Sequence, residues 1–190
     1  MAAIILVHSA LGLTDTVLRW ADEMRDEGHD VATPDLYGGD VYTDLAEGVE
    51  RADSGEMAAY VSIARDELQG LEGMPVYVGF SLGAAVAQIL ALTDPAARGV
   101  VLMHGALPPS SILDAAWGER LIGQLHYAVD DPWCEPEEVQ AFVRMAPDDA
   151  LEEFKYDGAG HLFGFEESPD YDSYQAALMH ERVLAFLASM

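Results

Sequence analysis

A serine in a glycine-flanked turn is the strongest chemical signal in this sequence. Ser81 lies in the segment Gly79–Gly83, which reads G-F-S-L-G, directly after the apolar run Val76–Val78. A tight turn from a strand into a helix exposes such a hydroxyl, and the glycines leave room where the backbone passes its neighbours. Because a serine needs an adjacent base to act as a nucleophile, the motif predicts nucleophilic catalysis. The alternative is an inert serine in a glycine-lined turn.

A histidine near the end of the sequence is the preferred base. His161 follows an expected strand over 151–156 through a glycine-rich loop. The chain order serine, acid, histidine is typical of hydrolases with this turn. A surface histidine without a role is the alternative at this position. His104 and His126, which end expected strands, are competing candidates.

Two adjacent aspartates are candidates for the acid that orients the histidine. Asp130 and Asp131 follow an expected strand over 122–128 and precede Pro132. Such a carboxylate holds the imidazole in the useful tautomer and stabilises its cation. Asp131 is preferred, although counting residues from the strand does not separate the two neighbours.

A tetrahedral intermediate also needs two backbone N–H donors for its oxyanion. One donor is expected from Leu82, the residue after the nucleophile. The other is expected from Ala10, in the segment His8–Gly12 that follows the first strand. His8 itself is interpreted as a structural histidine at a strand end, with a role as ligand or base as the alternative.

These residues need a scaffold of buried strands and covering helices. Apolar runs predict strands over 2–8, 31–33, 75–79, 99–104, 122–128 and 151–156. Helical spacing of apolar residues predicts helices over 14–27, 57–71, 82–92, 135–145 and 174–187. The stretch 38–55 is rich in Asp and Gly and is interpreted mostly as loop. The alternation predicts a single α/β domain over residues 1–190, whose mainly parallel sheet carries helices on both faces. Ligands of such sheets bind beyond the carboxyl ends of the strands, where the candidate residues fall.

Charge and composition exclude several other functions. The chain has 34 acidic and 9 basic residues, a formal net charge of −25, and such a surface repels nucleic acid and anionic lipid. We therefore expect no nucleic-acid and no membrane partner. High-salt adaptation or biased composition is the simplest explanation of the charge. The sequence holds no P-loop, no dinucleotide-binding glycine motif after a strand and no zinc-type Cys/His spacing, so we expect no cofactor and no metal.

Cysteine usage and hydropathy indicate the compartment. Cys134 is the only cysteine, which excludes an intrachain disulfide and fits a reducing compartment. No apolar run approaches the length that spans a bilayer. We expect a cytoplasmic protein, monomeric or homodimeric.

The chain resembles the dienelactone hydrolase family over nearly its whole length. Five stretches carry the resemblance, namely 6–12 (LVHSALG), 34–38 (PDLYG), 79–84 (GFSLGA), 126–133 (HYAVDDPW) and 159–163 (AGHLF). The resemblance implies a compact α/β-hydrolase fold without a large lid domain. It implies a triad of Ser81, Asp131 and His161, oxyanion donors at Ala10 and Leu82, and hydrolysis of an ester or lactone.

Two departures from the family pattern concern the substrate. The best-known members carry cysteine where this chain has Ser81, and a glutamate where it has Ser9, so a plain Ser-His-Asp mechanism is implied. Those members also hold a substrate carboxylate with arginine, whereas the corresponding position shortly after the histidine is Phe165 here. Arg51, from the intervening loop, is a candidate for such a cation. With Trp133, an aromatic candidate for the pocket lining, Ser9 and Phe165 are the expected substrate contacts.

The expected function is therefore hydrolysis of a small ester or lactone through an acyl-enzyme. The serine, the missing glutamate and Phe165 favour a small neutral ester over dienelactone itself. Two alternatives stay open. One is a non-catalytic ligand-binding or receptor protein on the same fold, and the other is an acyltransferase with an acceptor other than water.

Overall fold

The centre of the molecule is one parallel sheet, seen in a computed structural model that describes residues 1–190. Its six strands lie in the order β2-β1-β3-β4-β5-β6, and every neighbouring pair is parallel. The strands are β1 (Ala2–Val7), β2 (Asp30–Ala32), β3 (Met74–Phe80), β4 (Gly99–Met103), β5 (Ile122–Ala128) and β6 (Leu151–Tyr156). All six strands expected from the sequence are present, and no strand end differs from its expected position by more than one residue.

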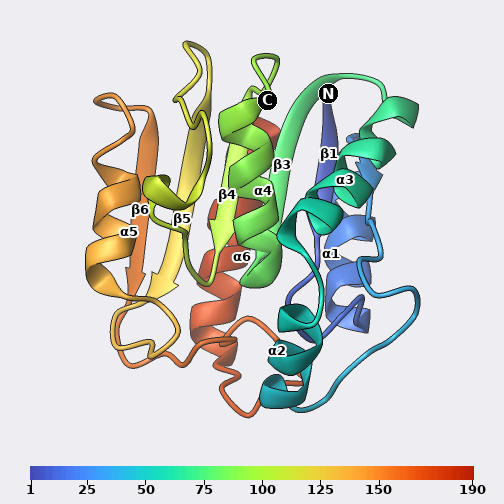
Figure 1. Ribbon diagram of the computed structural model, residues 1–190, viewed down its shortest axis with the longest axis vertical. Helices are drawn as coiled ribbons and strands as arrows, with labels where there is room; N and C mark the ends of the chain where they lie inside the picture. Colours follow the sequence, from blue (N-terminus) through green and yellow to red (C-terminus); the bar gives the residue numbers. More distant parts are fainter.

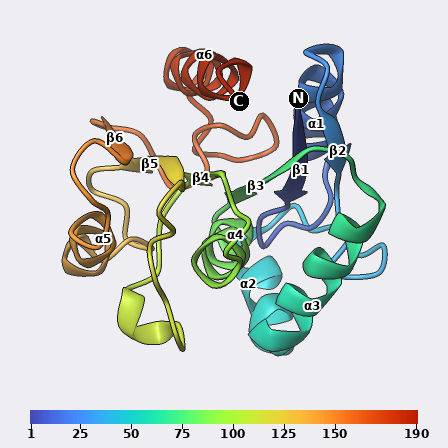
Figure 2. The same cartoon turned by 90° about the horizontal axis from the view of Figure 1, so that it is seen from above.

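Helices cover both faces of the sheet, which explains why its inner strands are mostly apolar. They are α1 (Asp15–Asp26), α2 (Leu45–Asp53), α3 (Met57–Glu67), α4 (Leu82–Thr93), α5 (Pro136–Val143) and α6 (Ser173–Ala188), with 3₁₀ turns η1 (Leu68–Gly70) and η2 (Pro109–Ser111). Figure 2 shows α1 and α6 on one face and α3, α4 and α5 on the other. None of the helices is both long and apolar enough to cross a membrane.

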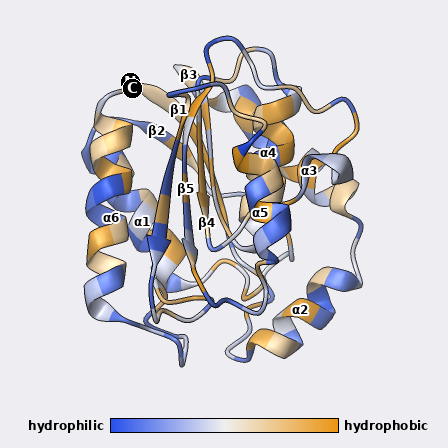
Figure 3. Cartoon of the chain, turned by 90° about the vertical axis from the view of Figure 1, so that its left-hand side faces the viewer, coloured by the Kyte–Doolittle hydropathy of each residue, from blue (hydrophilic) through white to orange (hydrophobic).

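The core is divided by the sheet into two apolar clusters. Successive residues of β1 alternate between them: Ile5 and Val7 face the α3/α4/α5 side, whereas Ile4 and Leu6 face the α1/α6 side. In Figure 3 the sheet stands between the two helical layers, and α4 is coloured almost wholly as hydrophobic. This continuous burial fixes the strand ends, and therefore the loops that carry the candidate residues.

The carboxyl ends of the strands meet at one end of the molecule, away from both termini (Figure 1). The N-terminal ammonium of Met1 donates to the carbonyl of Met190, 3.3 Å away. The segments that carry Ser81, Asp131 and His161 follow β3, β5 and β6 respectively. The topology therefore brings all three to the same edge of the sheet.

The expectation that 38–55 is mostly loop was wrong, because residues Leu45–Asp53 form α2. The Asp44 side chain accepts a hydrogen bond from the N–H of Glu47 at 3.1 Å, which is a typical N-terminal cap. Leu45, Gly48, Val49 and Ala52 follow helical spacing within α2, but this stripe spans only nine residues and its flanks are rich in Asp and Gly, which favour loops. A helix this short is marginal on its own, so tertiary contacts stabilise it. In Figure 1 it lies at the carboxyl end of the sheet.

Candidate active site

The backbone at Ser81 adopts the strained turn that the motif predicts. Ser81 has φ 53° and ψ −110° at the start of α4, and its N–H donates to the carbonyl of Met103 at 2.7 Å. A Cβ at Gly79 would lie 2.0 Å from the carbonyl oxygen of Gly83, and one at Gly83 would lie 2.2 Å from that of Val7. Both positions therefore require glycine, and the turn leaves the Ser81 side chain part-exposed.

His161 connects Ser81 to a buried carboxylate. Its Nε2 lies 2.8 Å from Ser81 Oγ, and its Nδ1 lies 2.6 Å from Asp131 Oδ2. Because the carboxylate only accepts, Nδ1 carries the proton and Nε2 is free to accept the hydroxyl proton. The arrangement has the hydrogen-bond pattern by which a histidine activates a serine.

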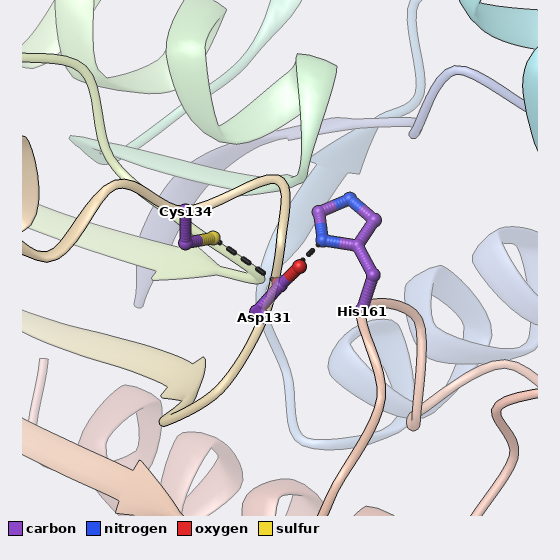
Figure 4. A group of neighbouring side chains, drawn as sticks. All are labelled: Asp131, Cys134 and His161. Atoms are coloured by element: carbon purple, nitrogen blue, oxygen red, sulfur yellow. Dashed lines mark hydrogen bonds and ion pairs between the residues drawn. The ribbon is translucent and has the colours of Figure 1, made fainter.

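Three donors converge on the Asp131 carboxylate. Besides His161, the N–H of Trp133 donates to Oδ1 at 2.9 Å and the thiol of Cys134 donates to Oδ2 at 3.2 Å. Figure 4 shows Asp131 between Cys134 and His161. Burial alone raises the pKa of Asp131, but the bonds from His161, Trp133 and Cys134 outweigh it and hold that pKa below its usual value. Asp130 is exposed, so it is Asp131 that the structure places against His161.

Asp131, Cys134 and His161 are also the residues with metal-binding chemistry that lie close together. One ligand atom from each falls within 4.8 Å of the others, and all three residues are buried. Burial, followed by the charge of Asp131, raises the pKa of the Cys134 thiol. The thiol is therefore a protonated hydrogen-bond donor, and the group is best described as a network that holds Asp131.

Two backbone N–H groups lie where oxyanion donors are expected. Leu82 is the first residue of α4, so its N–H has no acceptor within that helix, and the N–H of Ala10 makes no hydrogen bond. The close approach of Gly83 to the carbonyls of Val7 and His8 brings the first turn of α4 beside the segment that carries Ala10.

His8 braces the segment that carries Ala10. Its Nδ1 donates to the carbonyl of Ser9 at 2.7 Å, and its Nε2 accepts from the N–H of Leu36 at 3.0 Å. Both ring nitrogens are thus engaged in a fully buried side chain, and burial lowers the pKa of His8. These contacts agree with the structural interpretation of His8.

Helix α2 packs closely against the segment that carries Ala10, and Gly48 lies at the contact. A Cβ at Gly48 would lie 2.4 Å from the carbonyl oxygen of Ala10 and 2.9 Å from its carbonyl carbon. Gly48→Ala therefore forces α2 or the Ala10 segment to move. Loss of one oxyanion donor costs about 10²–10³ in kcat, so we expect a fall of that order with the fold retained. An assay of the ester hydrolysis expected from the sequence measures kcat, and circular dichroism measures whether the fold is retained.

Gly70→Ala is the matched control for Gly48→Ala, because a Cβ at Gly70 meets nothing within 4 Å. It is expected to retain the wild-type kcat in the same assay. If Gly48→Ala kept the wild-type kcat as well, α2 would have no part in positioning Ala10.

The other candidate histidines are buried and neutral. His126 donates from Nε2 to Gln124 Oε1 at 3.1 Å and accepts at Nδ1 from the Tyr156 hydroxyl at 2.9 Å. His104 packs against Phe163, with ring centroids 4.7 Å apart, and neither of its ring nitrogens has a partner. Neither ring is hydrogen-bonded to Ser81, so His161 alone occupies the position of a base.

These buried histidines predict sensitivity of the fold to acid. Burial lowers the pKa of His126 to about 3 and holds the pKa of His104 well below its usual value. A histidine in the unfolded chain has a pKa of about 6.5. Below that pH the unfolded chain therefore binds protons at these histidines and the folded chain does not. Stability therefore decreases as the pH falls below about 6.5, by up to about 1.4 kcal/mol per pH unit for each such histidine.

Denaturant unfolding of wild type and His126→Gln at several pH values between 7 and 5 measures this dependence. The variant cannot titrate at that position. As the pH falls, its free energy of unfolding is therefore expected to decrease less steeply than that of the wild type, by the slope that binding of one proton contributes. Parallel curves for the two proteins would contradict the assignment of His126.

A cavity of about 140 Å³ opens beside the candidate triad. Its lining comprises Val49, Ser81, Ala85, His104, Gly105, Ala106, Leu107, Trp133 and His161. Of the expected substrate contacts, Trp133 is in this lining, with its ring centroid 5.9 Å from that of His161. Val49 comes from α2 and was missed, because the segment 38–55 was interpreted as loop.

The structure places the other expected substrate contacts away from the cavity. Phe165 is fully buried and packs edge-on against Phe80, with ring centroids 5.0 Å apart. Ser9 is also fully buried, and its hydroxyl accepts from the N–H of Leu11 at 3.2 Å. These two expectations are corrected: both side chains serve packing and loop geometry, and neither reaches the cavity.

Arg51 is likewise engaged elsewhere. Its guanidinium lies 3.8 Å from Asp40, 3.3 Å from the hydroxyl of Tyr60 and 4.5 Å above the ring of Tyr37. It does not line the cavity, so it is not placed to hold a substrate carboxylate.

Comparison with known proteins agrees with the architecture of the chain. A sequence profile of the dienelactone hydrolase family matches residues 1–190. A dienelactone hydrolase-like promiscuous phosphotriesterase from metagenomic libraries superposes with a TM-score of 0.80 at 21% identity, covering 100% of this chain and 86% of that one. A Klebsiella pneumoniae subsp. pneumoniae protein named provisionally as a dienelactone hydrolase superposes with a TM-score of 0.81 at 18% identity, covering 100% and 88%.

A metagenome-derived lipolytic enzyme superposes with a TM-score of 0.72 at 13% identity, covering 100% of this chain and 94% of that one. No protein of curated function matches the chain in sequence. At these identities the structural likenesses show the fold, which is an α/β-hydrolase fold without a large lid, as the sequence predicted.

Proposed function

The chain belongs to the dienelactone hydrolase family, and from this membership and its site geometry we propose that it hydrolyses small esters or lactones through a Ser81 acyl-enzyme. The observation that carries the proposal is the distance of 2.8 Å between Ser81 Oγ and His161 Nε2. A hydroxyl at this distance from an unprotonated imidazole nitrogen can transfer its proton as it attacks.

In the first half of the proposed reaction, Ser81 forms a bond to the carbonyl carbon of the ester. His161 Nε2 takes the hydroxyl proton, and the charge on the carbonyl oxygen is stabilised by the N–H groups of Ala10 and Leu82. The intermediate then collapses, the bond to the leaving alcohol breaks, and His161 returns its proton to that alcohol.

In the second half, water takes the place of the alcohol. His161 removes a proton from the water as it attacks the acyl-enzyme, and then protonates Ser81 Oγ as the acid leaves. Asp131 stabilises the imidazolium through the 2.6 Å bond to Nδ1. Its depressed pKa keeps it ionised throughout, so it acts as a fixed negative charge.

The proposal is tested by the hydrolysis of p-nitrophenyl acetate and of a small lactone, with product analysis. Turnover to free acid and alcohol is the expected result. A phosphotriester belongs in the same panel, because one structural relative is named as a phosphotriesterase. Binding of the ester without turnover would favour a receptor, and transfer of the acyl group to an added alcohol in preference to water would favour an acyltransferase.

A further inference from the structure

We propose that the cavity beside Ser81 selects short, uncharged acyl groups, and that Gln88 sets this limit by fixing the cavity wall. The inference rests on the proposed ester or lactone hydrolysis and adds the class of acyl group and a residue that determines it. Gln88 touches no reacting atom, so its role is that of a positioning residue.

The size of the cavity limits the acyl group. Pockets for drug-sized ligands measure roughly 300–1,000 Å³, whereas this cavity measures about 140 Å³. A dry cavity of about 150 Å³ holds one benzene molecule. The volume therefore encloses only a few carbon atoms next to the reacting carbonyl and leaves the rest of a long chain outside the apolar wall.

The lining determines the polarity of the acyl group. Away from Ser81 and His161 its side chains include Val49 of α2, Ala85 of α4 and Leu107 from the segment after β4, and no acidic or basic residue other than histidine takes part. Burial holds the pKa of His104, the second lining histidine, well below its usual value, so that ring is uncharged near neutral pH. An apolar wall of this kind favours an apolar acyl group.

A carboxylate on the acyl group finds no counter-ion in this cavity. Arg51, two residues along α2 from Val49, is held by Asp40 and lies over the ring of Tyr37. Burying an unpaired carboxylate costs far more than burying an apolar group of the same shape. The net charge of −25 opposes the approach of an anion further.

Gln88 holds the wall that Leu107 provides. Its side chain is fully buried on α4, one helical turn after Ala85. The amide Nε2 donates to the carbonyl of Leu107 at 2.8 Å, and the amide Oε1 accepts from the N–H of Leu107 at 2.7 Å. Both backbone groups of Leu107 are thus fixed to α4, so the wall cannot withdraw without leaving two buried amide groups unpaired.

The next residues along the same wall are also constrained. A Cβ at Gly105 would lie 2.9 Å from Cys134 Sγ, and the same sulfur packs against the backbone of His104, 3.5 Å from its carbonyl oxygen. The segment from His104 to Leu107 is therefore held at both ends, by Cys134 and by Gln88. Its rigidity is what makes the size of the cavity a selective feature.

The first test compares acyl groups on the wild-type protein. Values of kcat/KM for p-nitrophenyl acetate, butyrate and octanoate are expected to fall by roughly 100-fold from acetate to octanoate. The mono-p-nitrophenyl ester of fumaric acid, whose trans double bond keeps the free carboxylate away from the ester carbonyl, is compared with p-nitrophenyl fumaramate, its neutral isostere. The charged ester is expected to react roughly 100-fold more slowly.

The second test loosens the wall. In Gln88→Ala the ratio of octanoate to acetate hydrolysis is expected to rise at least tenfold, because Leu107 is released.

Gln140→Ala is the matched control. The Gln140 side chain on α5 also makes hydrogen bonds, to Glu153 and Tyr127, but it lies outside the cavity lining. It is expected to leave the ratio unchanged. Leu107→Ala widens the same wall without removing the buried amide, and it replaces Gln88→Ala if that variant does not fold.

Three results would overturn the inference while leaving ester hydrolysis intact: octanoate hydrolysed as well as acetate, the fumarate ester as fast as its neutral isostere, or an unchanged ratio of octanoate to acetate hydrolysis in both wall variants. If the wild type hydrolysed none of these esters or a small lactone, the proposed function itself would fail.

Discussion

Replacing Ser81 with alanine is expected to lower kcat for ester hydrolysis by about 10⁶, as loss of the nucleophile does in a serine protease. The hydroxyl is the atom placed 2.8 Å from His161 Nε2, and alanine leaves no group to form the acyl-enzyme. Steady-state hydrolysis of p-nitrophenyl acetate measures the effect, and denaturant unfolding of the variant checks that the fold is retained. The positive φ of 53° at this position is equally strained for alanine and serine, so stability is expected to change little.

Ser110→Ala is the control for this variant, because Ser110 is an exposed residue of η2 without a side-chain hydrogen bond. It is expected to hydrolyse the ester at the wild-type rate. If Ser81→Ala retained activity within tenfold of wild type, the hydrolysis would proceed through a different group.

Replacing Asp131 with asparagine is expected to lower kcat by about 10⁴, the cost measured when the acid of a serine-protease triad becomes an amide. An amide nitrogen facing His161 donates where the carboxylate accepts, which favours the tautomer with its proton on Nε2, so that nitrogen cannot take the proton of Ser81. The negative charge that stabilises the imidazolium is lost as well. The same ester assay, carried out over a range of pH, measures the effect.

Asp130→Asn provides the matched control for the acid. The two aspartates are adjacent, but Asp130 is exposed and makes no side-chain contact with His161, whereas Asp131 is 5% exposed and lies 2.6 Å from Nδ1. We expect Asp130→Asn to retain the wild-type kcat. If both variants folded and Asp130→Asn lost more activity than Asp131→Asn, Asp130 would be the acid and the assignment of Asp131 would be wrong.

The sheet was predictable because strands that are buried on both faces consist mainly of apolar residues. Strands such as β1 are covered on both faces and therefore read as unbroken apolar runs. The position of Ser81 was predictable for a related reason: close backbone contacts at Gly79 and Gly83 allow no side chain there, so the turn leaves a recognisable motif.

Features that depend on tertiary contacts were not predictable in the same way. Helix α2 is only nine residues long, and its contact with the Ala10 segment passes through a glycine, the weakest helix former apart from proline. The choice between Asp130 and Asp131 depends on the turn after β5, where the N–H groups of Trp133 and Cys134 bond to Asp131. Counting residues does not give the direction in which that turn points.

Substrate contacts were the least predictable part of the site. Phe165 was expected at the cavity because the family resemblance implied a substrate-binding position there, but its apolar ring packs into the core against Phe80. Gln88 carried a usable signal, since it is a polar residue in the otherwise apolar helix α4. A buried amide in such a helix needs partners, and here they are the backbone groups of Leu107.

The most direct test of the central claim is covalent labelling with a fluorophosphonate, followed by mass spectrometry of the digested protein. An activated serine displaces fluoride from phosphorus, and the phosphonyl group stays on its oxygen. We expect one adduct per chain, located on Ser81, no adduct in Ser81→Ala, and strongly slowed labelling in Asp131→Asn. Equal labelling of wild type and Ser81→Ala, or an adduct on another residue, would contradict the assignment of Ser81 as the nucleophile.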